Sequence, residues 1–449
     1  MSFFSERYEQ MTPGSRRLFE RARRVAPGGV HHNLRYFAPY PLFVERAEGA
    51  YVWDVDGNRY VDLWMGHYAH ILGHRPQPVM ERFLAQAAGG AHWGIVHPLQ
   101  VELAETLVRL LPAAEEVRFC VTGTEATMYA LRLARAFTGR KVILKARGGW
   151  HGGNSELARA VHPPLDLPES AGLPPALEEY VDTFRYNDFE ESRRAIERHG
   201  ADLAAVIVEP LQNAFVPPEP GYLAWLRELT ERVGALLILD EVITGFRLGL
   251  TGAQGLYGVR PDLFTLGKVV GGGMPVAVIA GRREILERAS PLSGLPRGEA
   301  VLAGGGTFSA MPAAMAAGLA MVGYLEEHAP ALYEELATRG EHLRRGLAQA
   351  FAAAGLPARV FGVGSLFSVA FPASSDVELK NNEDVESRTD LYRRDHQFRL
   401  GMLAHGVYLV NGGGALSTAH GEEEIERVVE AAAAVAEEMV RHGGEAGSA

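Results

Sequence analysis

The sequence predicts an α/β protein whose main domain has a mostly parallel sheet with helices on both faces. Between about residues 65 and 280, helical patterns alternate with short apolar runs, which is typical of crossover connections between parallel strands. The runs are apolar throughout, as expected of strands buried on both faces. In such sheets ligands bind beyond the carboxyl ends of the strands, so the residues that follow each run are candidates for a functional site.

The first 64 residues are predicted to form an N-terminal segment. Residues 5–25 have a helical pattern. Residues 50–63 alternate around an Asp-Gly-Asn turn, which indicates a β-hairpin.

The main domain is predicted to span residues 65–306. Its expected helices cover 78–90, 99–111, 124–138, 190–199 and 221–233. Its expected strands cover 117–121, 142–146, 204–209, 236–240, 263–266 and 276–280. The segments 147–185 and 286–306 lack periodicity, and the first of them has the length of a functional lid.

Residues 307–449 are predicted to form a smaller α+β domain. A helical stretch at 309–354 precedes expected strands at 359–372 and 405–410. A final amphipathic helix is expected at 421–441, and the polar residues 373–390 are expected to form a surface loop.

The composition argues against several kinds of partner. The chain of 449 residues has a net charge of −11, whereas nonspecific nucleic-acid binding needs a basic face. No apolar run reaches the length of a membrane span, and the charged N-terminal residues do not resemble a signal peptide. Cys120 is the only cysteine, so no disulfide forms within the chain and a cytoplasmic location is expected.

Lysine is rare in this chain, so each lysine position is informative. The four lysines are Lys141, Lys145, Lys268 and Lys380. Lys268 follows an apolar run and is followed closely by three glycines. A buried lysine can lose its proton and become a nucleophile, which arginine cannot. The local pattern also fits an ordinary strand-end lysine on a glycine turn.

Three further polar groups follow predicted strands. Residues 122–124 (Thr-Gly-Thr) open a helix whose free N–H groups could hold a phosphate, although ordinary helix caps have the same composition. Asp240 and Glu209 follow two other strands, and a buried carboxylate needs a partner such as a protonated heterocycle nitrogen. Together with Lys268, these are the groups needed to hold pyridoxal phosphate.

Other chemistries lack their required residues. A strand that ends in Asp-Glu also occurs in nucleotide hydrolases, but no lysine here lies in a Gly-x-x-x-x-Gly-Lys-Ser/Thr loop. His67, His70 and His74 lie close together, yet no carboxylate completes a ligand set, so no metal is expected. No Gly-x-Ser-x-Gly motif supports a serine hydrolase.

Several motifs occur in the same order as in one enzyme family. They are PGGV (27–30), GAYVWDVDGNRYVD (49–62), TGTEATM (122–128), VEP (208–210), DEVITGFR (240–247), PDLFTLGK (261–268), GGGMP (271–275) and GGT (305–307). From about residue 27 to 441 the chain therefore resembles the class III, fold type I pyridoxal-phosphate aminotransferases. Within them it is most similar to the branch that contains glutamate-1-semialdehyde aminomutase and the β-amino acid aminotransferases.

This resemblance implies roles for particular residues. Lys268 would form the Schiff base with the cofactor and move protons, and Asp240 would pair with the pyridine nitrogen. The other implied cofactor-binding residues are Thr122, Gly123, Thr124, Trp150, His151, Glu209, Val242 and Thr307. Thr307 would reach the phosphate of a neighbouring subunit, which implies a homodimer with shared active sites. Arg35 matches the arginine that binds the substrate carboxylate.

The chain departs from the aminomutase pattern near the substrate. The segment after Glu209 is about two residues shorter, so Gln212 or Asn213 would replace the asparagine that contacts the cofactor hydroxyl. His67-Tyr68 replace a tryptophan-glycine pair, and residues 410–416 lack a substrate-side glutamate. An aminomutase must retain its diamino intermediate, and these changes would weaken that retention.

We therefore expect a ping-pong aminotransferase with a small-molecule amino donor and a 2-oxo acid acceptor. The donor would be a β-amino acid or another carboxylated amine held by Arg35. The alternatives are the glutamate-1-semialdehyde aminomutase reaction and racemase or epimerase activity on the same scaffold. A non-catalytic binding protein is a further alternative, against which the intact Lys268 and Asp240 argue.

Overall fold

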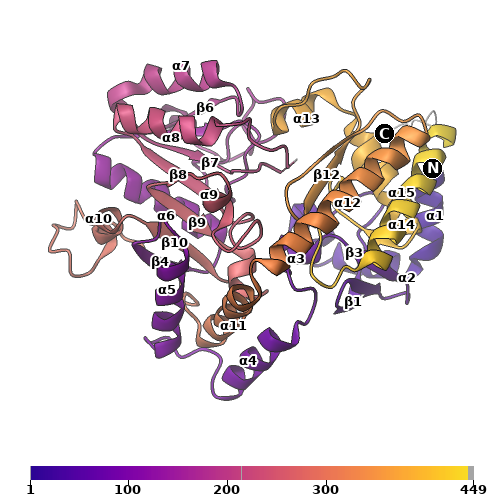
Figure 1. Ribbon diagram of the computed structural model, residues 1–449, viewed down its shortest axis with the longest axis horizontal. Helices are drawn as coiled ribbons and strands as arrows, with labels where there is room; N and C mark the ends of the chain where they lie inside the picture. The colour runs from indigo at the N-terminus through magenta and orange to yellow at the C-terminus, as the bar shows by residue number, and fades with distance from the viewer. Residues whose placement is uncertain (1, 214, 443–449) are drawn as a thin grey trace. The chain divides into compact units, whose positions relative to one another are not determined.

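The computed structural model describes residues 2–213 and 215–442, which form two compact units (Figure 1). The described residues of the first unit are 2–76, 335–378 and 388–442, and those of the second are 77–213, 215–334 and 379–387. These bounds differ from the predicted boundaries after residues 64 and 306. Residues 307–334 belong to the second unit because their helix α11 (Pro312–His328) packs against α4 (Gln77–Ala88) and α5 (Pro98–Leu110).

The second unit is built on a seven-stranded sheet. Its strands are β4 (Glu116–Cys120), β5 (Val142–Ala146), β6 (Val181–Phe184), β7 (Leu203–Val208), β8 (Leu236–Glu241), β9 (Leu263–Leu266) and β10 (Ala277–Gly281). The order is β4-β10-β9-β8-β7-β5-β6, and in this sheet β10 runs antiparallel to both of its neighbours. The neighbouring pairs from β9 to β6 are parallel. The predicted mostly parallel α/β fold is therefore confirmed; β6 is an additional strand within the segment predicted to be irregular.

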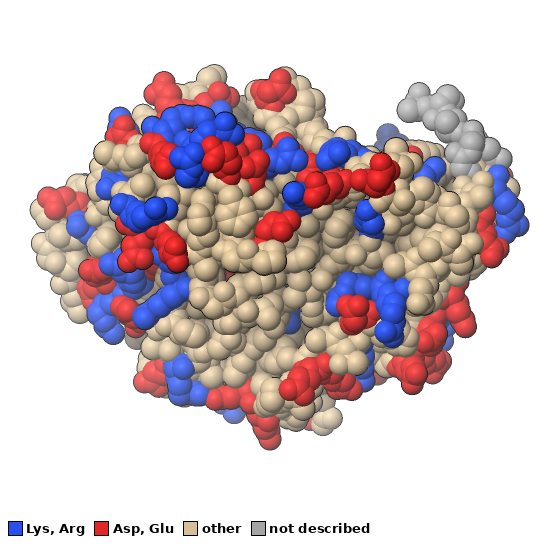
Figure 2. All heavy atoms as spheres, turned by 45° about the horizontal axis from the view of Figure 1, so that its top comes forward, with Lys and Arg blue, Asp and Glu red and all other residues tan. Residues whose placement is uncertain are grey.

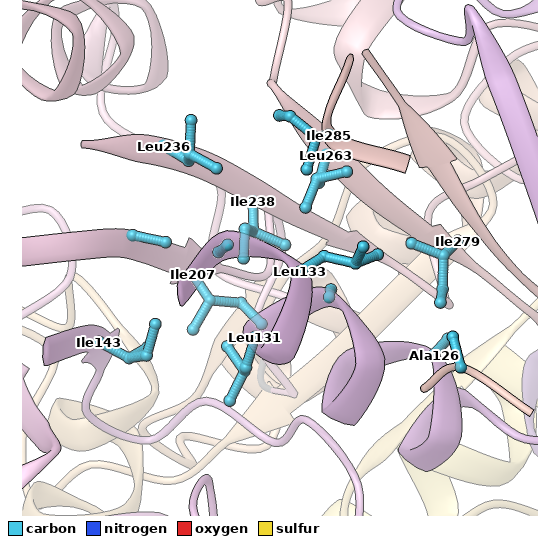
Figure 3. Close-up of a cluster of buried hydrophobic side chains, with 14 of the residues drawn as sticks. Ala126, Leu131, Leu133, Ile143, Ile207, Leu236, Ile238, Leu263, Ile279 and Ile285 are labelled. Atoms are coloured by element: carbon cyan, nitrogen blue, oxygen red, sulfur yellow. The ribbon is translucent and has the colours of Figure 1, made fainter. Parts of the chain in front are cut away.

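Helix α6 (Gly123–Thr138) packs against part of this sheet (Figure 3). The predicted phosphate loop lies at the start of this helix. Thr122 caps the helix, and Gly139 ends it with a left-handed φ of 68°. Its buried face, which includes Leu131 and Leu133, packs with the strand residues Ile207 and Ile238 in one hydrophobic core. This core fixes the start of α6 next to the strand ends.

Of the remaining helices in the second unit, α7 (Phe189–His199) and α8 (Tyr222–Val233) were predicted, as were α4 and α5, and α11 lies within the helical stretch predicted at 309–354. The helices α9 (Gly252–Leu256), α10 (Arg283–Leu286) and α13 (Asn382–Arg388) were not predicted. In α13, Arg388 already belongs to the first unit.

The first unit combines two small sheets with helices. Its helices are α1 (Phe3–Met11), α2 (Pro13–Ala22), most of α12 (Ala331–Ala353), α14 (Arg399–Ala404) and α15 (Glu422–His442). One sheet has the order β1 (Val44–Glu48), β2 (Tyr51–Asp54), β3 (Arg59–Asp62), β13 (Val407–Tyr408), and the other has β11 (Arg359–Phe361), β12 (Leu366–Ala370), β14 (Gly413–Ala415). The predicted hairpin is the antiparallel pair β2–β3, and β13 joins β3 in parallel.

A turn with left-handed backbone follows β3. Met65, Gly66, His67 and Tyr68, which form α3 (Met65–Tyr68), have φ values of 45°, 59°, 65° and 68°. Non-glycine residues lose roughly 1–2 kcal/mol each in this conformation, so the surrounding contacts must hold the turn. The turn includes two of the predicted substrate residues.

The segment predicted to be a surface loop at 373–390 contains α13 and is partly buried, so this prediction was wrong. Asn382 donates from Nδ2 to Gly148 O at 2.9 Å, and Asn381 donates from Nδ2 to Tyr186 O at 2.9 Å. Glu383 pairs with Arg147 at 2.8 Å. These polar side chains bind the second unit's backbone and charges, which polarity alone does not distinguish from solvent exposure.

The surface drawn in Figure 2 carries positive and negative side chains interspersed with one another. That face has no broad basic patch of the kind that nonspecific nucleic-acid binding requires. Within the described ranges, no helix combines the length and the apolar character needed to cross a membrane.

Candidate active site

The parallel strands bring three predicted groups to one edge of the second unit's sheet. Glu209 follows β7, Asp240 lies near the end of β8, and Lys268 follows β9, and these three strands run in the same direction. The groups are close enough for their charges to interact, because both carboxylates raise the pKa of Lys268 against the effect of burial. The sequence therefore predicted this grouping correctly from strand ends alone.

Asp240 is held as a carboxylate by three hydrogen bonds. His151 lies 2.8 Å from Oδ2 through its Nδ1, while Thr265 Oγ1 and the Val242 N–H donate to Oδ1 at 2.8 and 3.2 Å. Burial acts to raise the pKa of Asp240, but these hydrogen bonds outweigh it and lower the pKa below its ordinary value. Asp240 is thus a fixed anionic acceptor suited to a protonated ring nitrogen.

His151 orients this carboxylate. Burial lowers the pKa of His151, although Asp240 opposes the shift, so the ring is neutral near pH 7. Because its Nδ1 faces an ionised carboxylate, Nδ1 carries the proton and donates it to Asp240. The buried Nε2 has no hydrogen-bond partner among the described residues. The predicted cofactor residue His151 therefore bonds to the carboxylate that would hold the cofactor.

Glu209 is buried beside these groups and binds the loop that carries Trp150. The Trp150 N–H donates to Glu209 Oε2 at 2.8 Å. Burial, together with the charge of Asp240, raises the pKa of Glu209 to about 8, while the Trp150 N–H, Lys268 and Lys145 act in the opposite direction.

Lys268 occupies a strained backbone position. Its φ is 52°, a conformation that costs a non-glycine residue roughly 1–3 kcal/mol and is concentrated at functional sites. Burial lowers the pKa of Lys268, while Asp240 and Glu209 partly offset that shift. A lowered pKa increases the fraction of free amine, which is the nucleophilic form.

The start of α6 offers an anion-binding site. Thr122 Oγ1 accepts from the Glu125 N–H at 3.2 Å, and the Glu125 carboxylate accepts from the Thr122 N–H at 3.3 Å. Among the described residues, no acceptor contacts the N–H groups of Gly123 and Thr124 in the first helical turn. These groups and the positive end of the helix dipole suit a phosphate.

Val242 lies between the phosphate loop and the lysine segment. Its methyl groups are 3.1 Å from where a Cβ would stand at Gly123 and 3.0 Å from the same position at Gly267. Larger residues at either glycine would displace Val242, so the close approach explains both glycines. Trp150 has 41% of its surface exposed, which leaves the indole available to cover a ligand.

The structure separates the roles of Gln212 and Asn213. The buried Gln212 donates from Nε2 to Arg147 O at 2.8 Å and accepts the Asn382 N–H at 3.2 Å. Its amide therefore joins α13 to the backbone at Arg147. Asn213 is exposed, which makes it the better candidate for the predicted contact to the cofactor hydroxyl.

The other predicted residues lie on exposed segments or in the first unit. Thr307 is exposed, and a Cβ at the preceding Gly306 would lie 3.1 Å from Glu125 Oε1 at the start of α6. Arg35 lies in the turn η2 (Asn33–Arg35), is exposed, and has no carboxylate in ion-pair range among the described residues. His67 stacks obliquely on Trp64 at 4.3 Å. Their contacts with substrate stay predictions.

Two residues of this site were not predicted. Thr265 lies within the apolar run of β9 and bonds to Asp240, and its hydroxyl among apolar neighbours is a signal that could have been noticed. Lys145 is fully buried in β5, and a rare lysine inside an apolar strand is a comparable signal.

These residues fit pyridoxal phosphate. The ionised Asp240 suits the pyridine nitrogen, Lys268 supplies an amine, and the N–H groups of Gly123 and Thr124 suit the phosphate. When bound, this cofactor acts as an electron sink for negative charge on the substrate carbon. The fold and the site together define an amine-handling enzyme of this cofactor class.

The family assignment agrees with this chemistry. The family model "Aminotransferase class-III" matches residues 35–419, and the chain belongs to this family. It is therefore a pyridoxal-phosphate enzyme. The predicted family, cofactor and fold class are confirmed.

Curated relatives and solved structures cover nearly the whole chain. The chain is 41% identical over 437 residues to glutamate-1-semialdehyde 2,1-aminomutase 2 of an Exiguobacterium species, covering 95% of this chain and 97% of the relative. It is 39% identical over 443 residues to glutamate-1-semialdehyde 2,1-aminomutase of Chloroflexus aurantiacus, covering 96% and 97%.

Among solved structures, it is similar to an omega-transaminase from Sphaerobacter thermophilus (TM-score 0.87, 35% identity, 95% and 98% coverage). It is also similar to a β-phenylalanine aminotransferase from Variovorax paradoxus (0.86, 32%, 98% and 98%) and a glutamate-1-semialdehyde aminomutase from Pseudomonas aeruginosa (0.84, 26%, 96% and 96%).

Proposed function

We propose that this enzyme is a dual-substrate aminotransferase that takes the amino group of a carboxylated amine and passes it to a 2-oxo acid. A β-amino acid is the proposed donor class. The observation that carries the donor class is Arg35, whose exposed guanidinium has no carboxylate partner in the described ranges and is therefore available to a substrate. The solved structures at 35% and 32% identity carry transaminase names, which supports the same class.

Five residues would serve the reaction. Lys268 Nζ would carry a proton to and from the substrate carbon, because it is the amine beside the anionic Asp240. His151 and Thr265 would keep Asp240 oriented and ionised. Trp150 would exclude water from one face of the ring site.

Glutamate-1-semialdehyde 2,1-aminomutase is the second candidate. The names of the curated relatives at 41% and 39% identity favour it over the dual-substrate reaction. Two observations argue against it. Residues 413–415 form the strand β14 and carry no acidic side chain. The Gln212 side chain is hydrogen-bonded to backbone groups and is not free to bind a ligand. The two reactions differ in whether the keto product leaves the enzyme.

A substrate screen separates these candidates. The holoenzyme would be incubated with glutamate-1-semialdehyde alone, with β-amino acids plus 2-oxoglutarate, and with single amino acids without an acceptor. Amino transfer that depends on both a β-amino acid and an acceptor is expected. Isomerisation of the semialdehyde alone would establish the aminomutase, and loss of optical purity in a single amino acid would establish a racemase or epimerase.

Replacement of Arg35 by alanine is expected to raise the KM for carboxylated donors by about 10- to 100-fold, because a charge-assisted pair is lost. The KM for an amine without a carboxylate should change little. Arg24→Ala removes another exposed arginine of the first unit and is the matched control. Equal changes in KM for both donor types would mean that Arg35 has a structural role.

We also propose a homodimer with shared active sites. Large apolar side chains are exposed in two segments of the second unit: Trp93, Ile95 and Val96, and Leu302 and Phe308 beside Thr307. The ring of Phe308 lies 5.1 Å from that of His92, so the two segments are adjacent. An apolar surface of this kind is typical of subunit interfaces. Sedimentation of a monomer at micromolar concentration would contradict the proposal.

A cytoplasmic location is proposed on the chemistry of the single cysteine. Cys120 is buried, and burial raises the pKa of its thiol to about 12. Such a thiol stays protonated and unreactive, as suits a chain without stabilising disulfides.

A further inference from the structure

Lys145 is a charged residue in the interior of the protein, where lysine is rarely found. It lies in β5, between β6 and β7, and its side chain is fully buried. Burying a charged amine is costly unless its donors are satisfied. Its neighbours in the strand are apolar, so a methionine or leucine would pack in this core at a lower cost. The presence of lysine therefore suggests that its ammonium group has a specific role.

The ammonium has three donors, and three backbone carbonyls accept them. Lys145 Nζ lies 2.9 Å from Gly149 O, 3.2 Å from Leu157 O and 2.7 Å from Arg159 O. These carbonyls belong to the loop that follows β5. A single buried group therefore ties both ends of residues 149–159, which we call the β5 loop.

The β5 loop carries the groups that meet the proposed cofactor ring site. The Trp150 N–H bonds to Glu209, His151 bonds to Asp240, and the His151 carbonyl accepts from Thr127 Oγ1 at 2.7 Å. The loop has no regular secondary structure, and glycines at 149, 152 and 153 make its backbone adaptable. It therefore needs an anchor if Trp150 and His151 are to keep one position.

We propose that Lys145 is a positioning residue whose ammonium fixes the β5 loop, and through it Trp150 and His151, for cofactor binding. It acts through the loop and does not touch the reacting atoms. Burial lowers the pKa of Lys145 to about 8, with Glu209 and Glu169 opposing the shift, so at pH 7 all three donors are present. The proposal rests on the proposed placement of Trp150 and His151 at the ring.

Lys145→Met tests the proposal, because methionine has a similar length but no donors and would leave three buried carbonyls unpaired. Lys141→Met is the matched control, since Lys141 is exposed immediately before the same strand. Hydrogen exchange of the apo-protein would be compared for residues 149–159 and for β8. Binding of pyridoxal phosphate to the apo-protein would be measured by equilibrium dialysis.

Lys145→Met is expected to speed exchange in residues 149–159 while β8 stays protected, and to raise the Kd for pyridoxal phosphate by about tenfold or more. Lys141→Met should change neither. A purely structural lysine would instead lower the unfolding midpoint and leave both loop exchange and Kd unchanged, which would overturn the proposal. If Lys145→Met does not fold, Lys145→Gln, which keeps two donors, should give the same changes at smaller size; unchanged exchange and Kd in that variant would also overturn it.

The experiment distinguishes this inference from the proposed function. Exchange in the apo-protein reports whether Lys145 fixes the loop, independently of any ligand. Faster loop exchange with an unchanged Kd would refute the link to the cofactor. Failure of the wild-type protein to transaminate would refute the proposed reaction while leaving the exchange result intact.

Discussion

Lys268→Ala is expected to reduce amino-group transfer by at least about 10³-fold, because it removes the amine that moves the proton at the substrate carbon. Lysine is also the residue that can bond covalently to the cofactor aldehyde, so borohydride should no longer attach the cofactor to the chain. Steady-state rates and the mass of the reduced protein measure these two effects separately.

The lost activity should not come from a lost fold. Lys268 has a φ of 52°, a conformation that alanine adopts with the same strain, so the unfolding midpoint should change little. Asp240 and the N–H groups at the start of α6 would remain and should still bind pyridoxal phosphate noncovalently. Lys141→Ala, which removes an exposed lysine, is the control. Substantial turnover by Lys268→Ala would disprove the assigned role.

Asp240→Asn is expected to lower kcat by about 10²- to 10³-fold, the usual cost of removing a preorganised electrostatic group. The asparagine oxygen could still accept from His151 Nδ1, but the amide nitrogen cannot accept from Thr265 and Val242, and the negative charge is lost. Without that charge, the pyridine nitrogen would lose its stabilising partner as a cation. The rate of substrate carbon deprotonation, followed by loss of deuterium from labelled donor, measures this effect.

A graded variant strengthens this second prediction. Thr265 lowers the pKa of Asp240 through its hydroxyl, and Thr265→Val removes that hydrogen bond. The pKa of Asp240 should therefore rise, and the acidic limb of the pH–rate profile should move to higher pH. The maximum rate should fall much less than in Asp240→Asn. A profile unchanged in Thr265→Val, together with full activity in Asp240→Asn, would exclude the proposed role of the carboxylate.

The parts of the fold with strong local patterns could be predicted from the sequence. The apolar runs of β7, β8 and β9 were predicted because burial on both faces demands uninterrupted apolar residues. Their shared direction then placed Glu209, Asp240 and Lys268 together. β6 was missed because it has four residues and follows irregular chain, so it carries little periodic signal.

Long-range polar contacts could not be predicted. Gln212 was predicted to contact a ligand, but it binds Arg147 O and the Asn382 N–H instead. These partners lie 65 and 170 residues away in the sequence, so no local pattern indicates them. The prediction of a surface loop at 373–390 was wrong for the same reason. Asn381 and Asn382 have the composition of a solvated loop, but backbone carbonyls of the second unit satisfy them.

The pairing of β3 with β13 has a consequence for the folding of this protein during its synthesis on the ribosome. Val61 and Asp62 pair with Val407 and Tyr408, which are synthesised 346 residues later. At about 5–20 residues per second, the N-terminal strands wait roughly 17 to 70 seconds before their sheet can be completed. During that interval, the unpaired edge of β3 is exposed to other nascent chains. The N-terminal strands are therefore expected to need protection by chaperones until synthesis is complete.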